Sequence, residues 1–118
     1  MPDYKKLIVW TKAKSLAVAV YGAVNRNSVS RDFGLRDQML RAAVSVASNI
    51  AEGYARETAA DRAHFLNVAR GSCAELETQL LIAEEAGLIA SREAIALRAD
   101  SDEVSRMLYA LRSRIRNE

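Results

Sequence analysis

The residues of this chain most able to do chemistry are its only histidine, His64, and its only cysteine, Cys73. A di-iron site in a helical bundle needs two Glu-x-x-His units, which one histidine cannot supply. The usual zinc sites need more ligands than one cysteine and one histidine. Cys73 lies between Ala69 and Leu76 at helical spacing, which is typical of a buried, inert thiol.

Motifs that bind phosphate or activate a nucleophile are also missing. The 118 residues contain no G-x-x-x-x-G-K-[ST] loop and no G-x-G-x-x-G loop. Serines, threonines and carboxylates are plentiful, but no spacing pairs a nucleophile with a base. The sequence therefore predicts a protein that is not an enzyme and has no catalytic residues, no metal and no cofactor.

Four polar residues lie at or beside the apolar seams of two expected helices: Asn49, Glu52, Ser72 and Glu75. An unpaired amide in an apolar face is costly, so Asn49 needs a hydrogen-bond partner. We predict that Asn49 bonds across to the third helix near Gly71 and Ser72, which would fix the register of the two helices. The alternative is that these residues contact a ligand or RNA.

Two acid–base pairs have i,i+4 spacing, Glu52 with Arg56 and Asp37 with Arg41. We predict exposed ion pairs within one helix, each worth only a few tenths of a kcal/mol. The alternative is that these side chains pair between subunits.

Seven basic residues are predicted to bind nucleic acid: Lys5, Lys12, Arg41, Arg106, Arg112, Arg114 and Arg116. They would line one surface if the first and fourth helices are neighbours. The positive field of such a surface is sufficient for salt-dependent phosphate binding. Trp10 and Tyr21 fall on an apolar seam and are expected in the core, so they offer no platform for stacking bases. Recognition would therefore use the backbone and shape of RNA.

The net charge of +2 hides an uneven distribution along the chain. Residues 4–31 hold six basic residues and no acid, whereas residues 72–103 hold eight acids against two arginines. Residues 105–118 hold four arginines against one acid. Such segregation suits self-assembly or an anionic partner, and the alternative is that the charges are only solvated helix faces.

The composition is that of a helical bundle, with 50% hydrophobic residues, 6% aromatic residues, five glycines and one proline. Apolar residues recur at steps of three and four along four segments, each predicted to be one amphipathic helix. Their bounds are about 4–25, 33–55, 59–86 and 92–116. Short connections favour antiparallel neighbours, so we predict an all-α fold: an antiparallel up-down-up-down four-helix bundle, with residues 1–118 as a single domain.

Polar and glycine residues mark the expected helix ends. Ser30 or Asp32 is the predicted N-cap of the second helix, and Thr58 opens the third in a capping-box-like sequence ending at Asp61. Gly87 is placed to end the third helix in the left-handed region.

The sequence also predicts where the protein resides. No apolar run approaches the roughly 20 residues that cross a bilayer, and the first residues lack the long apolar run of a signal peptide. A single cysteine fits a reducing compartment. We therefore expect a cytoplasmic protein with no membrane partner.

Two segments carry a resemblance to a known family: RAAVSVASNIAEGYAR, preceded by GLRDQ, and FLNVARGSCAELETQL. They are similar to the four-helix-bundle family named for the 23S rRNA intervening sequence. The accessory variability determinants of diversity-generating retroelements resemble the same family. The similarity runs from about Tyr4 to Leu111, nearly the whole chain.

The resemblance implies an assembly and partners. Members of the family form homopentamers, and in the retroelement members the ring has a positive surface and works with RNA and a reverse transcriptase. A homopentamer that binds RNA, with a reverse transcriptase or another protein as partner, is therefore implied here. The P-x-x-E expected before the second helix is replaced by SVSRDF at residues 28–33, so the entry loop is expected to differ.

Three hypotheses about function follow. The first is a non-enzymatic, oligomeric scaffold or adaptor, a homopentamer that binds RNA through Lys and Arg. The second is a purely structural or protein-binding module with no nucleic-acid role. The third, a bundle that holds a small molecule or metal, is disfavoured because ligand residues are lacking.

Overall fold

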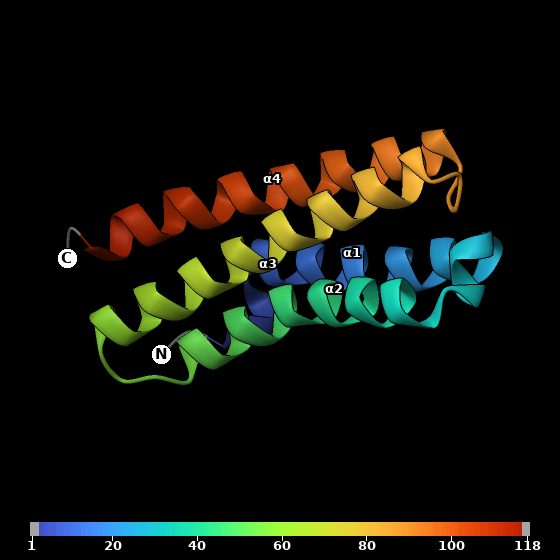
Figure 1. The fold of residues 1–118 in the computed structure, drawn as a ribbon. Coiled ribbons are helices and arrows are strands. Elements are labelled where there is room, and N and C mark those ends of the chain that lie inside the picture. Colours follow the sequence, from blue (N-terminus) through green and yellow to red (C-terminus); the bar gives the residue numbers. More distant parts are fainter. Residues whose placement is uncertain (1–2, 117–118) are drawn as a thin grey trace.

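The computed structural model describes residues 3–116, which form four long α-helices and two short 3₁₀ turns. In chain order these are η1 (Tyr4–Lys6), α1 (Ile8–Arg26), η2 (Ser28–Arg31), α2 (Phe33–Tyr54), α3 (Ala59–Glu85) and α4 (Ser91–Arg116). The predicted all-α four-helix bundle is confirmed, and Figure 1 shows consecutive helices running in opposite directions. Among the described residues, no helix is both long and apolar enough to cross a membrane.

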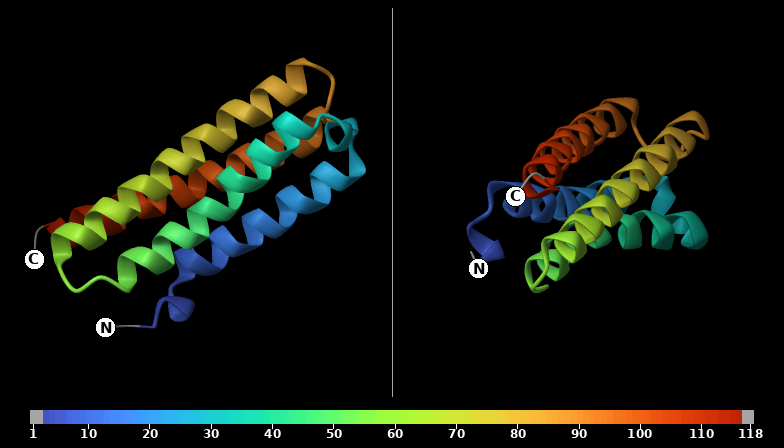
Figure 2. Two further views of the ribbon diagram at one scale, coloured as in Figure 1. Left: turned by 60° about the horizontal axis from the view of Figure 1, so that its bottom comes forward. Right: turned by 90° about the vertical axis from the view of Figure 1, so that its left-hand side faces the viewer.

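Each helix packs against two neighbours around an elongated bundle of 46 × 21 × 18 Å. α1 lies between α2 and α4, and α3 lies between the same two helices on the other side. The α1–α2 and α3–α4 connections meet at one end of the bundle (Figure 2). The α2–α3 connection and the two ends of the described chain lie at the other end.

The first helix begins later than the predicted residue 4. Asp3 accepts a backbone hydrogen bond at 3.0 Å and thereby caps a separate 3₁₀ turn, after which Leu7 is extended (φ −76°, ψ 129°). This break lets Tyr4 and Leu7 pack against the core, with the Tyr4 ring 5.2 Å from that of Trp10. The other three helices match their predicted bounds to within one residue at each end.

The predicted helix caps are present. Asp32 accepts a hydrogen bond at 3.2 Å from the backbone N–H of Leu35 and begins α2. Thr58 begins α3 in the same way, accepting from the N–H of Asp61 at 3.1 Å. These bonds satisfy backbone donors that a helix start leaves without intrahelical partners.

Gly87 ends α3 in the left-handed conformation, with φ at 74°. Its N–H donates to the carbonyl of Glu84 at 3.1 Å, and the N–H of Leu88 donates to that of Ala83 at 2.8 Å. This is the Schellman pattern, in which a residue without a Cβ reverses the chain while the last helical carbonyls keep partners.

The core consists of two apolar clusters that follow each other along the bundle. The first, toward η2, includes Leu16, Val20, Val24, Met39, Leu76, Leu80 and Leu97. The second, toward the termini, includes Val9, Val46, Ile50, Leu66, Cys73, Val104 and Leu108. Tyr21 is 46% exposed, so its predicted place in the core is wrong, and Trp10 is only partly buried. Tyr21 misses the core because it lies about 100° around α1 from the buried Val20.

Gly53 lies where α2 meets the beginning of α3. A Cβ added there would lie 3.1 Å from the Cβ of Phe65 and 3.2 Å from the main-chain oxygen of Arg62. Because the second atom belongs to the backbone, α3 itself would have to shift. Gly71, in the middle of α3, is the opposite case, since an added Cβ would meet no atom within 4 Å among the described residues.

We expect Gly53→Ala to destabilise the bundle by about 1–2 kcal/mol, since overpacking outweighs the gain in helix propensity from alanine. The matched control is Gly71→Ala, which should add up to about 1 kcal/mol of stability because only the propensity gain operates there. Urea unfolding measures both changes. A Gly53→Ala protein as stable as the control would contradict the close packing of α2 on α3.

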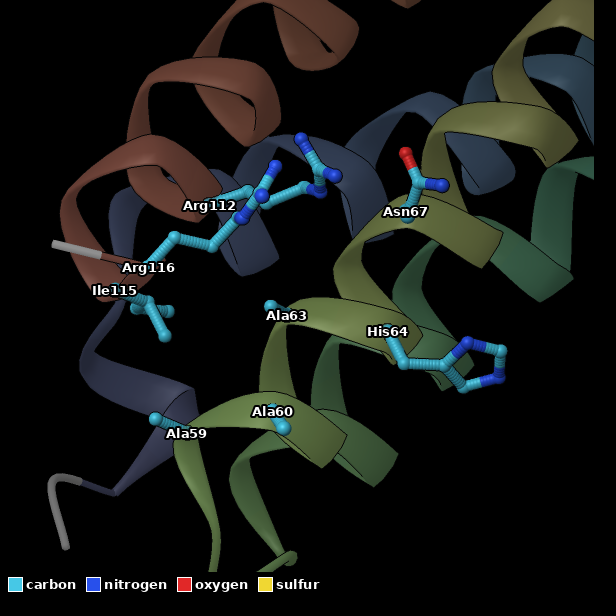
Figure 3. A pocket seen from close by; sticks show the side chains of 8 residues that line it. All are labelled: Ala59, Ala60, Ala63, His64, Asn67, Arg112, Ile115 and Arg116. Carbon is cyan, nitrogen blue, oxygen red and sulfur yellow. The ribbon is translucent and has the colours of Figure 1, made fainter.

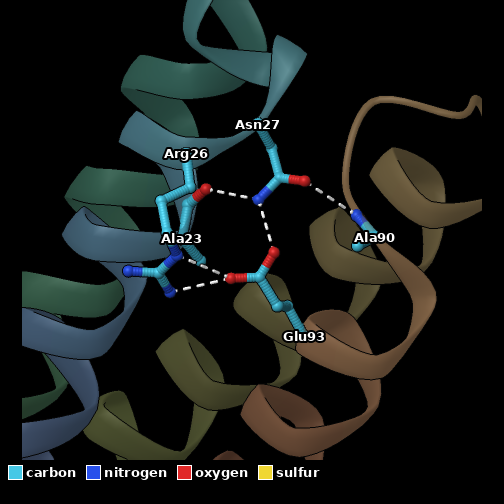
Figure 4. A network of polar contacts seen from close by, with 5 residues as sticks. All are labelled: Ala23, Arg26, Asn27, Ala90 and Glu93. Atoms are coloured by element: carbon cyan, nitrogen blue, oxygen red, sulfur yellow. Dashed lines mark hydrogen bonds and ion pairs between the residues drawn. The ribbon is translucent and has the colours of Figure 1, made fainter.

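Asn27 joins the two connections that meet at the η2 end (Figure 4). Its Nδ2 donates to the carbonyl of Ala23 at 2.7 Å and to Oε2 of Glu93 at 2.7 Å. Its Oδ1 accepts from the N–H of Ala90 at 2.9 Å. Arg26 completes the network by donating from Nε and Nη2 to the other oxygen of Glu93, at 2.9 and 2.7 Å. One side-chain amide thus fixes the end of α1 to the start of α4.

We expect Glu93→Gln to lose about 1–2 kcal/mol of stability at pH 7, because a charge-assisted network is broken. Hydrogen bonds from Asn27, and then from Arg26, lower the pKa of the Glu93 carboxyl in the folded protein. The ionised carboxylate therefore stabilises the fold above the ordinary glutamate pKa, and this contribution is lost as the pH falls through the lowered folded value.

Urea unfolding between pH 7 and pH 3 measures this effect. The stability gap between the natural protein and Glu93→Gln should shrink as the pH falls. Glu85→Gln, which changes an exposed carboxylate near the same end, serves as control and should change stability little. A gap that stays constant down to pH 3 would show that the charge of Glu93 does not stabilise the fold.

Candidate nucleic-acid interface

The seven basic residues predicted to bind nucleic acid are spread over several faces of the bundle. α1 and α4 are neighbours, as the prediction required, but basic side chains near their contact form ion pairs with carboxylates. Lys12 Nζ lies 2.8 Å from Glu103 Oε1, and this hydrogen bond raises the pKa of Lys12 and lowers that of Glu103. Arg106 pairs along α4 with Asp102 at 3.1 Å. These two cations are therefore already paired with carboxylates.

Part of the charge segregation is thus explained within one chain. Lys12 and Arg26 come from the basic segment 4–31, and their partners Glu103 and Glu93 come from the acidic segment 72–103. α1 and α4 bring the two segments together, so contact between them does not require another subunit.

Arg41 and Lys5 lie apart from the rest of the set. Arg41 lines a hollow of about 280 Å³ between α2 and α3, which it shares with Ser45 and Glu75. Lys5 belongs to η1, where its Nζ lies 5.9 Å from the centre of the Tyr4 ring. The carboxylate of Glu75 beside Arg41 makes that hollow less suited to an anion.

Arg112 and Arg116 do come together. They are four residues apart and therefore share a side of α4, whereas Arg114 lies about 200° around the helix from Arg112. Figure 3 shows both side chains reaching from α4 toward α3 near Asn67, while His64 points away at the rim. Arg114 is exposed on another side.

The space beneath these two arginines is a hollow of about 480 Å³ between the start of α3 and the end of α4. Its lining residues are Ala59, Ala60, Ala63, His64, Asn67, Arg112, Ile115 and Arg116. Within residues 3–116 no carboxylate lines it. Two guanidinium groups over small apolar side chains make an anion-binding geometry, since guanidinium donors form forked hydrogen bonds with phosphate or carboxylate.

The structure adds two residues that the sequence argument missed, Arg70 and Tyr109. The guanidinium carbon of Arg70 lies 5.0 Å from the centre of the Tyr109 ring, and Arg70 Nη1 donates to Asn67 Oδ1 at 3.3 Å. Tyr109 is 54% exposed and lines a second hollow, of about 270 Å³, together with Arg112, Ser113 and Arg116. We call the surface formed by His64, Asn67, Arg70, Tyr109, Arg112 and Arg116 the α3–α4 basic groove.

A signal for Tyr109 was present in the sequence. It precedes Arg112 by three residues and Arg116 by seven, so all three fall on one side of a helix. Arg70 could not be found in this way, because its place beside Tyr109 depends on how α3 and α4 align.

The predicted polar contact between α2 and α3 exists, but through another residue. Ser45 and Ser72 share a hydrogen bond of 2.8 Å between their hydroxyls, and Ser72 also donates to the carbonyl of Val68 at 3.3 Å. Among residues 3–116, no hydrogen bond joins Asn49 to α3: its Nδ2 donates to the carbonyl and hydroxyl of Ser45, at 2.8 and 2.9 Å. The prediction for Asn49 was wrong because a residue one turn earlier supplies both acceptors.

The remaining polar residues lie at the surface. Glu52 pairs with Arg56 within α2, as predicted. The predicted pair of Asp37 with Arg41 does not form, since Asp37 instead contacts the adjacent Arg36 at 3.0 Å. These exposed pairs contribute little to stability.

A family model described as "23S rRNA-intervening sequence protein" matches residues 5–110. The chain belongs to this family. A crystal structure from Bacteroides thetaiotaomicron, described as a protein with unknown function from the S23 ribosomal protein family, has a similar fold. Its TM-score is 0.81 at 25% identity, over 88% of this chain and 97% of that one. No curated protein matches.

In this member of the 23S rRNA-intervening sequence protein family, Cys73 is buried in the second core cluster. Burial raises the pKa of its thiol to about 11, and the Ser101 hydroxyl of α4 donates to its backbone carbonyl at 3.4 Å. A thiol with so high a pKa carries almost no thiolate at neutral pH. Among the described residues, no group of three or more His, Cys, Asp or Glu is arranged to hold a metal.

We expect Cys73 to resist labelling by a thiol reagent such as DTNB in native buffer at pH 8. Only about one thiol in a thousand would be ionised at that pH, and the sulfur is covered by the core. In urea above the unfolding transition, one equivalent should react within seconds to minutes. Fast stoichiometric labelling of the native protein would contradict the buried, inert assignment.

Proposed function

We propose that this protein is a non-enzymatic helical scaffold that self-associates and binds RNA through the α3–α4 basic groove. The observation that carries the proposal is the convergence of Arg112 and Arg116 over a hollow that no carboxylate lines within residues 3–116. Paired guanidinium groups attract phosphate oxygens, and each phosphate contact releases counterions from the nucleic acid. Arg70 adds a third cation to the same groove.

Self-association is supported by apolar side chains that a single bundle leaves in water. Residues of this kind that are more than half exposed occur on all four helices: Ile8, Val18, Phe33, Ile82, Ile95 and Tyr109. Burial of such side chains between subunits would add a hydrophobic driving force. The resemblance described above implies a ring of five.

RNA affinity should depend both on the salt concentration and on the arginines of the α3–α4 basic groove. At about 50 mM salt we expect the double variant Arg112→Gln/Arg116→Gln to bind a structured RNA at least tenfold more weakly than the natural protein. The slope of log K against log salt should fall by about one to two in that variant, because phosphate contacts are lost. Fluorescence anisotropy across a salt series measures both quantities.

A double variant at residues that line neither hollow of the groove serves as the matched control. Arg41→Gln/Arg106→Gln also removes two charges, one from the α2–α3 hollow and one from an existing ion pair, so it should keep RNA affinity within about threefold. An equal loss of affinity in the two double variants would mean that only net charge matters. An RNA affinity that does not change with salt concentration would overturn the proposed nucleic-acid role.

Light scattering in the same salt series tests assembly. A species of about five chains that gains mass with RNA at low salt is the expected result. An assembly whose mass does not change when RNA is added would favour a purely structural or protein-binding module. A stable monomer would overturn the self-association part of the proposal.

A further inference from the structure

We infer that the α3–α4 basic groove recognises the terminal phosphate of an RNA strand, with the terminal nucleoside beside Tyr109. This inference rests on the proposed function and names the part of RNA that the groove would take. It draws on the shape of the groove, the number of guanidinium groups in it, and the position of the exposed aromatic ring.

The donors suit a phosphomonoester better than an internal phosphodiester. A terminal phosphate carries a charge between about −1.5 and −2 at pH 7 and has three free oxygens, whereas an internal phosphodiester carries one charge and two free oxygens. Arg112 and Arg116 line the same hollow and offer two guanidinium forks. The larger charge and the third free oxygen let a terminal phosphate attract both forks more strongly than a phosphodiester does.

The shape of the site points the same way. The hollow of about 480 Å³ is floored by small or apolar side chains, among them Ala59, Ala60, Ala63 and Ile115. A chain end can enter such a concavity. An internal phosphate, flanked by a sugar on each side, is held more easily along an open ridge.

The second hollow supplies room for the nucleoside. It shares Arg112 and Arg116 with the first hollow and adds Tyr109 and Ser113. A phosphate held between the two arginines would therefore place its attached nucleoside next to the Tyr109 ring. Arg70 lies over this ring, and Tyr109 remains 54% exposed for contact with a base. Stacking on an aromatic ring is tolerant of base identity.

The test compares short single-stranded RNAs of one sequence that carry a 5′-phosphate, a 3′-phosphate, or hydroxyl groups at both ends, with the dye placed internally. We expect one phosphorylated form to bind about tenfold more tightly than the hydroxyl form in fluorescence anisotropy. Arg112→Gln and Arg116→Gln should each abolish this preference. Tyr109→Leu should reduce it, and Arg106→Gln, at a residue that lines neither hollow and pairs with Asp102, should leave it intact. Circular dichroism checks that every variant remains helical.

Competition distinguishes an RNA end from a free nucleotide. Adenosine monophosphate should displace phosphorylated RNA only at much higher concentration than unlabelled phosphorylated RNA, and adenosine should not displace it. A monophosphate that binds as tightly as the RNA end would overturn the inference in favour of a free-nucleotide site.

The remaining outcomes separate this inference from the proposed function. Equal affinity for all three RNAs, still weakened by Arg112→Gln and Arg116→Gln, would overturn end recognition and leave backbone binding in place. No detectable binding to any RNA, including the structured RNA above, would overturn both.

Discussion

The rotation of α4 about its own axis decides which of its side chains meet α1, which meet α3 and which form the core. The Asn27–Glu93 network fixes the start of α4, and the exposed Lys12–Glu103 pair joins its middle to α1. Val104 and Leu108 then point into the second core cluster. In this orientation Tyr109, Arg112 and Arg116 lie on the side of α4 toward α3, where Arg70 contacts the Tyr109 ring. The basic groove is thus a consequence of contacts made up to about six turns away.

Charged residues along the chain have two different roles, one in ion pairs between helices and one in a positively charged surface. Acids of segment 72–103 pair with cations of α1 at Lys12–Glu103 and Arg26–Glu93, and these two pairs join α1 to α4, whereas the Arg106–Asp102 pair lies within α4. Past Glu103 no acid occurs until Glu118, so the last turns of α4 carry arginines that lack nearby carboxylates in sequence. Paired charge joins α1 to α4, and the arginines at the end of the bundle, which lack carboxylates nearby in sequence, create a positive field.

The fold could be predicted because each helix has its own local signals. The seam from Leu66 to Ala83, the Asp32 and Thr58 caps and the glycine at 87 are all readable from spacing and residue type, and all are confirmed. The site could be predicted only in part. Spacing alone groups Arg112 with Arg116, but the meeting of Arg70 with Tyr109 and of Ser45 with Ser72 depends on the alignment of two helices. Hydrophobic patterns specify which side of a helix is buried, and they leave the axial offset between helices open.

In the proposed assembly, several copies of the groove would compensate for the weak phosphate binding of a single copy. Two or three arginines on one chain give few phosphate contacts, and such contacts alone are readily screened at physiological salt. A ring would repeat the groove by symmetry, so that one RNA could engage several copies, each new contact being intramolecular and favoured by a high effective concentration. The groove at one end of α3 and α4 shares only Tyr109 with the strongly exposed apolar residues. The proposed assembly and the proposed RNA binding would therefore use largely separate side chains, which allows each to be changed without the other.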